Sequence, residues 1–86
     1  MYRVEFYKQA ARYYENLDAK IRRRINAAIE DMAQNPFEGP HIKRLKGKLE
    51  GKYRYSVGGL RVIYAVDEDH EIIYVEAIGP RGDVYK

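Results

Sequence analysis

Two alternating runs of residues on either side of Gly58-Gly59 constrain the fold of this chain more than any other feature. The run before the glycines is KYRYSV at 52–57, and the run after them is LRVIYAV at 60–66. Alternation of apolar and polar residues is typical of a half-buried strand, and two glycines between two such runs predict a tight β-hairpin. A slip of one residue would bury arginines, so the hydrophobic pattern determines the register of this hairpin.

In the predicted register, six side chains point toward the core. They form three opposed pairs: Val57 with Leu60, Tyr55 with Val62, and Tyr53 with Tyr64. The opposite face receives Arg54, Ser56, Arg61 and Ile63, with Ser56 directly across from Arg61. This hairpin therefore has an apolar face for a core and a face that bears arginines.

A third alternating run, EIIYVEAIG at 71–79, follows an acidic turn at 67–70. If the turn takes those four residues, the core face gains two further pairs, Tyr64 with Ile73 and Val62 with Val75. The same register places Glu76 opposite Arg61, where we expect an orienting ion pair, with a general-base role for Glu76 as the less favoured reading. Gly79-Pro80 ends this run and leaves open to which face residues 81–86 turn.

The first half of the chain changes from a strand pattern to a helical pattern at Lys8. Residues 2–7 predict a short strand with Val4 and Phe6 on one face. Apolar residues at helical spacing follow, and Asp18 supplies an N-cap for a second helix that ends at Asn35-Pro36. The second helix carries an apolar stripe made of Ile21, Ile25, Ala28, Ile29 and Met32. Residues 37–51, with one proline and three glycines, predict a single long loop.

These elements predict one α+β domain over residues 1–86. It consists of an N-terminal strand, a two-helix hairpin and a three-stranded antiparallel meander, with the helices on one face of a single sheet of about four strands. A chain of 86 residues has room for one core and one site. No apolar run approaches the roughly 18 residues of a membrane span, and no signal peptide opens the chain, so we expect a cytoplasmic protein without a membrane partner.

The residue types and motifs disfavour metal-dependent, thiol-dependent and serine-hydrolase chemistry. The chain has no cysteine and two histidines, which disfavours disulfides, thiol nucleophiles and a transition-metal site. Sequence motifs of phosphate-binding loops, zinc proteases and serine hydrolases are absent. We interpret His41 and His70 as surface residues. The sequence therefore predicts neither a metal nor another cofactor.

Positive charge is concentrated in one stretch, although the formal net charge is only +3. Between residues 41 and 61 one acid, Glu50, accompanies seven cations: Lys43, Arg44, Lys46, Lys48, Lys52, Arg54 and Arg61. One interpretation is a solvated loop, and the other is a surface for phosphates or for an acidic partner. The nine tyrosines slightly favour contact with nucleic acid.

Arginines of the predicted outer face form the candidate site. Taken singly, a surface arginine most often serves in an ion pair of small energy. If Arg81 turns to this face, three arginines (Arg54, Arg61 and Arg81) repel one another there unless an anion binds, and guanidinium groups match phosphate oxygens in a bidentate way. Cleavage of RNA by its own 2′-hydroxyl needs a proton acceptor, cations around the phosphorus and a donor for the leaving oxygen, and it needs no metal.

Three segments resemble the RelE/ParE family of toxins from toxin–antitoxin systems over nearly the whole chain. They are NPF at 35–37, RLKGKLEGKYRYSVGGLRVIYAV at 44–66 and IGPRGDVYK at 78–86. The resemblance implies a type II toxin whose partner is an acidic, partly disordered, RelB-like antitoxin. Toxins of one branch are ribosome-dependent endonucleases of messenger RNA, and toxins of another branch inhibit DNA gyrase.

The resemblance to the RelE branch implies roles for individual residues. Arg61 matches the arginine that steadies the phosphate in the transition state, Arg81 the second catalytic arginine, and Tyr85 the tyrosine near the chain end. Arg54 falls where that branch has a basic residue. Ser56 stands where many relatives have a second lysine or arginine, which leaves the general base unassigned. The remaining cations that we expect to bind substrate beside Ser56 are Lys43, Arg44, Lys46, Lys48 and Lys52.

The sequence thus predicts a metal-independent endoribonuclease (an mRNA interferase) that acts on ribosome-bound messenger RNA and inhibits translation. The alternative is a gyrase inhibitor with no catalytic activity of its own, which has no need of Tyr85. A plain RNA-binding module is a third reading, and it is disfavoured because double-stranded-RNA domains end in a helix whereas this chain ends in a predicted strand and tail.

Overall fold

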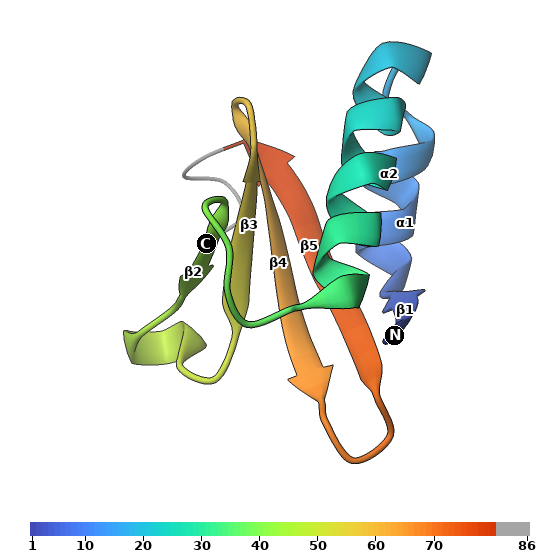
Figure 1. Ribbon diagram of the computed structural model, residues 1–86. Helices are drawn as coiled ribbons and strands as arrows, with labels where there is room; N and C mark the ends of the chain where they lie inside the picture. The colour runs from blue at the N-terminus through green and yellow to red at the C-terminus, as the bar shows by residue number, and fades with distance from the viewer. Residues whose placement is uncertain (81–86) are drawn as a thin grey trace.

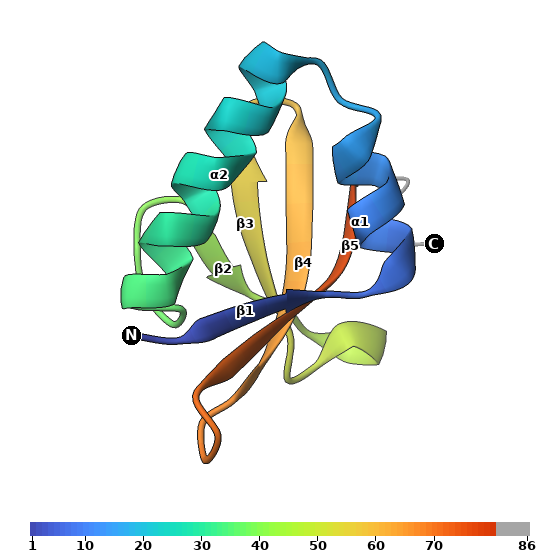
Figure 2. The same ribbon diagram turned by 90° about the vertical axis from the view of Figure 1, so that its right-hand side faces the viewer.

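Five strands and two α-helices follow one another along residues 1–80, the part of the chain that the computed structural model describes. The elements are β1 (Arg3–Phe6), α1 (Lys8–Glu15), α2 (Ala19–Gln34), β2 (Ile42–Arg44), a 3₁₀ helix (Gly47–Leu49), β3 (Tyr53–Val57), β4 (Leu60–Asp67) and β5 (Ile72–Pro80). The strands form one sheet in the order β1-β5-β4-β3-β2, and both helices lie on one face of it (Figures 1 and 2). Strand β1 pairs parallel with β5, whereas the other neighbours are antiparallel. The predicted α+β fold class is confirmed.

The ends of α2 follow from the residues that flank it. The side chain of Asp18 accepts a hydrogen bond of 2.9 Å from the backbone N–H of Ile21, which satisfies one of the donors that a helix N-terminus leaves unpaired. Asn35 at the other end has an extended backbone, because the ring of Pro36 disfavours a helical conformation in the residue before it. Between these ends the predicted apolar stripe lies in the core, where Ile25 and Met32 are fully buried.

The β3–β4 hairpin has the predicted register, with Val57 opposite Leu60 and Ser56 opposite Arg61. On the core face the rings of Tyr53 and Tyr64 stack with their centroids 5.6 Å apart. The hydroxyl of Tyr64, a fully buried side chain, donates a hydrogen bond of 2.7 Å to the carbonyl of Pro36. Burial raises the pKa of this phenol, so it remains a donor and ties the segment after α2 to the sheet.

Residues 37–51 do not form one long loop, and this prediction is wrong. Residues Ile42–Arg44 form β2, which extends the sheet to five strands with Ile42 opposite Tyr55 and Lys43 opposite Arg54. Only Ile42 of this strand packs against the core. A strand of three residues contains too little alternation to stand out among the proline and glycines around it.

The predicted pairing of β4 with β5 is also wrong. The loop takes residues 68–71 instead of 67–70, so Tyr64 lies opposite Val75 and not opposite Ile73. A register shift between Ile63 and Tyr64 leaves Glu76 as one extra residue in β5. Such a bulge resets the alternation, which lets Val75 and Ile78 both lie in the core. As a result, Arg61 faces Gly79, and the predicted ion pair between Arg61 and Glu76 does not form.

A first prediction concerns the turn of the hairpin. Gly58 has a φ of +58°, and a Cβ at this position would lie 2.9 Å from Nη2 of Arg24. The substitution Gly58→Ala should therefore lower the free energy of unfolding by about 1–2 kcal/mol, as measured by urea denaturation. Gly59→Ala is the matched control, because a Cβ there meets no atom of the described chain within 4 Å. Equal losses for the two variants would contradict the assignment of a left-handed conformation to Gly58.

Candidate functional site

The sheet face turned away from the helices carries cations on three neighbouring strands. Lys43 on β2 lies opposite Arg54 on β3, and Ser56 on β3 lies opposite Arg61 on β4. Opposed residues share a face of a sheet, and residues two apart on one strand share it too. Lys43, Arg54, Ser56 and Arg61 therefore project from the same side, and we call them the outer-face cluster. Arg54 and Arg61 are diagonal neighbours within it.

The two arginines of the outer-face cluster lie close against the sheet. Their Nε atoms are buried and have no hydrogen-bond partner among residues 1–80. The Nη1 atom of Arg61 donates to the carbonyl oxygens of Gly58 (3.3 Å) and Leu60 (3.1 Å), so this guanidinium bends back toward the hairpin turn. Ile63, on the same face, is only 2% exposed, so part of this face is shielded from solvent. A buried N–H without a partner is costly, and an anion that reached these groups would remove that cost.

The carboxylates of residues 1–80 do not neutralise Arg54 or Arg61 with an ion pair. Glu76 instead pairs with Lys52 at 2.6 Å between Oε1 and Nζ, and the Glu76 side chain is only 15% exposed. Gln9 of α1 donates a hydrogen bond to the Glu76 carbonyl at 2.9 Å, which fixes the bulge from the helix side. Lys52 thus shares its charge with a neighbouring acid, whereas Arg54 and Arg61 have no ion pair to an acid of residues 1–80.

The basic stretch of the sequence divides between two sides of the sheet. Lys43 faces outward beside Arg54, whereas Arg44 stands on the other face, 5.9 Å from the ring centroid of Tyr53. Arg44 and Lys46 line a separate pocket of about 460 Å³ that also contains Glu50. Lys48 lies in the 3₁₀ helix and is exposed. The outer-face cluster is therefore a smaller site than the seven cations of the sequence suggested.

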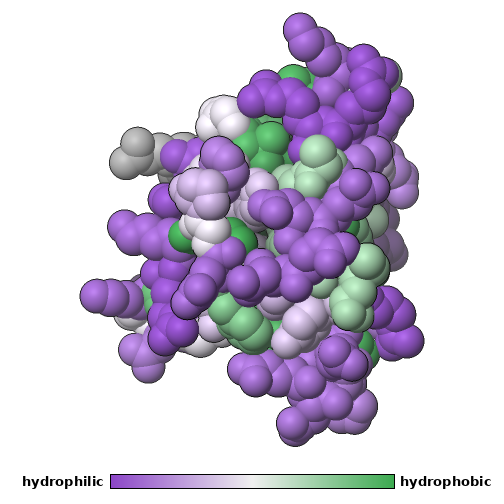
Figure 3. Space-filling view, in the orientation of Figure 1, coloured by the Kyte–Doolittle hydropathy of each residue, from purple (hydrophilic) through white to green (hydrophobic). Residues whose placement is uncertain are grey.

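Hydrophilic residues cover most of the surface seen in Figure 3, where apolar residues form only separate patches.

The other two predicted catalytic residues, Arg81 and Tyr85, lie outside the described residues. The last described pairs place Gly79 opposite Arg61 and Pro80 opposite Leu60. The described chain thus ends beside Arg61. The roles of Arg81 and Tyr85 remain predictions from the resemblance.

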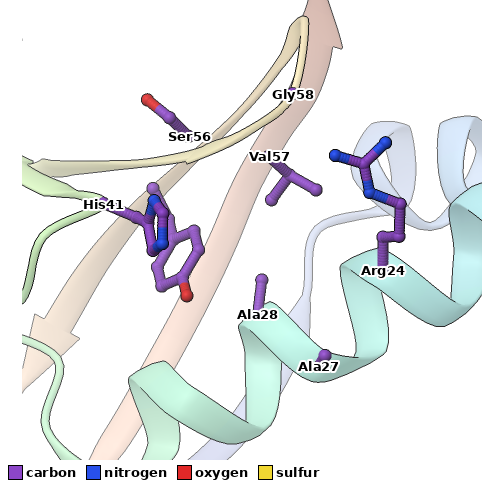
Figure 4. A pocket seen from close by; sticks show the side chains of 8 residues that line it. Arg24, Ala27, Ala28, His41, Ser56, Val57 and Gly58 are labelled. Atoms are coloured by element: carbon purple, nitrogen blue, oxygen red, sulfur yellow. The ribbon is translucent and has the colours of Figure 1, made fainter.

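A pocket of about 480 Å³ between α2 and the end of β3 was not expected from the sequence (Figure 4). The His41 ring lies on the ring of Tyr55 with the centroids 5.5 Å apart. The Tyr55 hydroxyl donates a hydrogen bond of 2.7 Å to Asp31 of α2. Sequence reasoning placed His41 on the surface, where it does lie, but gave no signal for its neighbours, because these depend on the pairing of β2 with β3. The lining residues are Arg24, Ala27, Ala28, His41, Tyr55, Ser56, Val57 and Gly58.

His70 lies at the other end of the sheet and is exposed, as predicted. Its backbone N–H and its ring both bond to the carboxylate of Asp67, and these bonds lower the pKa of Asp67. This pair closes the β4–β5 turn. Among residues 1–80, no cluster of three or more histidines or acids could hold a metal ion, and neither helix is long and apolar enough to span a membrane.

A second prediction concerns the phenol of Tyr55, since burial, followed by the hydrogen bond and the charge of Asp31, raises its pKa from 10.0 to about 12. NMR of carbon-13-labelled tyrosine should show this midpoint, and Asp31→Asn should lower it only partly, because burial remains. A raised pKa in the folded state contributes stability below pH 10 that is lost as the pH rises toward 12. An unchanged midpoint in the Asp31→Asn protein would contradict the hydrogen bond.

Comparisons of the sequence with a family model and with known proteins both find toxins. A family model described as "ParE toxin of type II toxin-antitoxin system, parDE" matches residues 4–85. The chain is 31% identical over 91 residues to a putative RelE-like toxin protein of Escherichia coli, which covers 98% of this chain and 90% of that protein.

Two solved structures have the same fold at the level of the whole chain. The RelBE2 toxin–antitoxin complex from Mycobacterium tuberculosis matches with a TM-score of 0.80 and 25% identity, over 93% of this chain and 98% of that chain. The archaeal RelE–RelB complex from Pyrococcus horikoshii matches with a TM-score of 0.77 and 28% identity, over 94% of this chain and 96% of that chain.

Proposed function

This chain belongs to the RelE/ParE family of toxins of type II toxin–antitoxin systems, and from this premise we propose that it is an endoribonuclease that cleaves messenger RNA on the ribosome and so inhibits translation. The observation that carries the proposal is the outer-face cluster. It presents Arg54 and Arg61 with buried Nε groups that have no partner among residues 1–80 and no ion pair to an acid of that range. Such a site favours an anion, and the phosphate of RNA is the anion that guanidinium groups match well.

In the proposed reaction the 2′-hydroxyl of one nucleotide attacks the adjacent phosphorus, and the bond to the 5′-oxygen of the next nucleotide breaks. The products are a 2′,3′-cyclic phosphate and a 5′-hydroxyl. One proton leaves the attacking hydroxyl and one joins the leaving oxygen. Arg54 and Arg61 stabilise the negative charge that grows on the phosphoryl oxygens. This scheme requires no metal.

We assign the remaining roles by resemblance. Arg81 is the second catalytic arginine, and Tyr85 stacks on a base or serves the proton transfer. Ser56, directly opposite Arg61, contacts the substrate as a hydrogen-bond donor. Lys43 is the nearest of the accessory cations, since it neighbours Arg54. Lys52 contributes to binding with a charge that it shares with Glu76. The other accessory cations contribute from outside the outer-face cluster: Arg44, Lys46 and Lys48.

The proposed partners are an acidic antitoxin, the ribosome and messenger RNA in the cytoplasm. One of the two solved relatives is the RelBE2 toxin–antitoxin complex, and the other is a complex of RelE with RelB. A carboxylate-rich segment would complement the outer-face cluster and associate rapidly with it. Antitoxin and RNA would then compete for the same arginines.

Inhibition of DNA gyrase is the second candidate function. The family model that matches residues 4–85 names the ParE toxin. The resemblance to the ParE branch implies a protein that binds gyrase without chemistry of its own. Under this alternative the outer-face cluster would only contribute to binding. Cleavage products from ribosome-bound messenger RNA distinguish the two candidates.

A third prediction tests the role of Arg61. Single-turnover cleavage of ribosome-bound messenger RNA should fall about 100- to 1000-fold in Arg61→Ala, because a main stabiliser of transition-state charge is lost. Arg3→Ala is the control, since Arg3 lies on β1 at the other edge of the sheet and pairs with Glu5. Both variants should unfold like the wild type, and undiminished cleavage by Arg61→Ala would exclude this role.

A fourth prediction tests the accessory cations. A variant with Lys43, Arg44, Lys46 and Lys48 all changed to Gln should bind ribosomes more weakly, and its affinity should depend less steeply on salt, because fewer phosphates are neutralised. Ribosome pelleting across a salt series measures both quantities. Wild-type affinity together with a wild-type salt slope would show that these side chains are merely solvated surface.

A further inference from the structure

The pocket at His41 lies where one edge of the sheet is open. Strand β2 pairs with β3 only as far as Ile42 opposite Tyr55, so no strand of residues 1–80 lies beside Val57, the last residue of β3, or beside Gly58 on that edge. Ser56 belongs both to this pocket and to the outer-face cluster. We call this cavity the edge pocket. It adjoins the outer-face cluster at Ser56.

One wall of the edge pocket is an aromatic platform. The exposed ring of His41 is tilted by 33° on the ring of Tyr55, and only 6% of Tyr55 is exposed. The hydrogen bond from the Tyr55 hydroxyl to Asp31 holds the Tyr55 ring in place. The backbone of His41 is held too, because its carbonyl accepts a hydrogen bond of 2.9 Å from the backbone N–H of Ser56. A fixed and exposed aromatic ring of this kind offers a surface on which a nucleobase can stack.

The opposite wall carries a cation. The guanidinium of Arg24 lies against Gly58, where an added Cβ would be 2.9 Å from its Nη2 atom. The carbonyl of the same glycine accepts the bond from Arg61. Arg24 and Arg61 therefore approach one turn residue from α2 and from β4. Among residues 1–80, the side chains that line the pocket include no carboxylate. Figure 4 shows Arg24 and His41 on opposite sides of the pocket, with Val57 and Ala28 between them.

We propose that the edge pocket binds one nucleotide of single-stranded RNA, the neighbour of the nucleotide held at Arg61, with its base on His41 and its phosphate at Arg24. This inference rests on the proposed function, since it names a substrate subsite of the same reaction. The volume of about 480 Å³ is in the range of small-ligand sites. Ser56 lies between His41 and Arg61, so their backbones are about two strand spacings, or roughly 10 Å, apart. Because every base has a face that stacks, this subsite adds affinity with little preference for one base.

The test uses the purified full chain and a short single-stranded RNA that carries one 2-aminopurine, whose fluorescence is quenched when it stacks. Titration at low salt should show quenching with the wild type and much less with His41→Ala, together with about tenfold weaker binding. His41→Phe should restore the quenching, because it keeps an aromatic ring. His70→Ala is the matched control, since His70 is exposed at the far end of the sheet.

The cation is tested in the same titration. Arg24→Gln should weaken binding and reduce its salt dependence by about one phosphate contact, whereas Arg23→Gln, an exposed neighbour on α2 outside the pocket lining, should do neither. Absence of quenching with the wild type, or equal quenching with His41→Ala, would overturn the proposal. If Arg24→Gln and His41→Ala weakened binding of the cognate antitoxin and left RNA binding unchanged, the pocket would serve the antitoxin and the proposal would again be wrong.

Failure of the proposed function has a different signature. In that case the wild type would leave ribosome-bound messenger RNA intact, whatever the quenching shows. If cleavage occurs and falls in Arg61→Ala but not in His41→Ala or Arg24→Gln, the proposed function stands and the edge pocket has no part in it.

Discussion

The register of the β3–β4 hairpin is the constraint on which the rest of the structure depends. Side chains alternate along a strand, so one register sends Tyr55, Val62 and Tyr64 beneath the helices and sends Arg54 and Arg61 to the other face. The left-handed conformation of Gly58 makes the two-residue turn that holds this register. A slip by one residue would bury the arginines and expose the tyrosines. Core packing and the cationic face thus have one common cause.

The bulge at Glu76 completes the site from the neighbouring strand. It resets the alternation of β5 so that Val75 and Ile78 both reach the core, and it places the Glu76 carboxylate on Lys52. With Gly79 opposite it, Arg61 has no acidic side chain directly across the sheet. Because of this bulge, the carboxylate of Glu76 neutralises Lys52 and not Arg61. In the proposed function, the pairing of Glu76 with Lys52 leaves Arg54 and Arg61 available for the phosphate of RNA.

Features set by local periodicity were predictable from the sequence. The N-cap at Asp18, the stripe of α2 and the pairing of Ser56 with Arg61 each depend on residues close together in the chain. Features that depend on distant pairings were not: β2 is too short to show a pattern, and the edge pocket exists only once β2 lies beside β3. Resemblance supplied Arg81 and Tyr85, which lie outside the described residues and remain predictions.

We propose that this toxin acts by cutting translated messenger RNA. Primer extension on messages isolated from cells after induction tests it most directly, with a second copy of one message whose start codon is destroyed. We expect new 5′ ends within the coding region of the translated message and none in the untranslated copy. Growth arrest with no new ends in either message, accompanied by trapped gyrase on DNA, would contradict the claim and assign the protein to the gyrase-inhibiting branch.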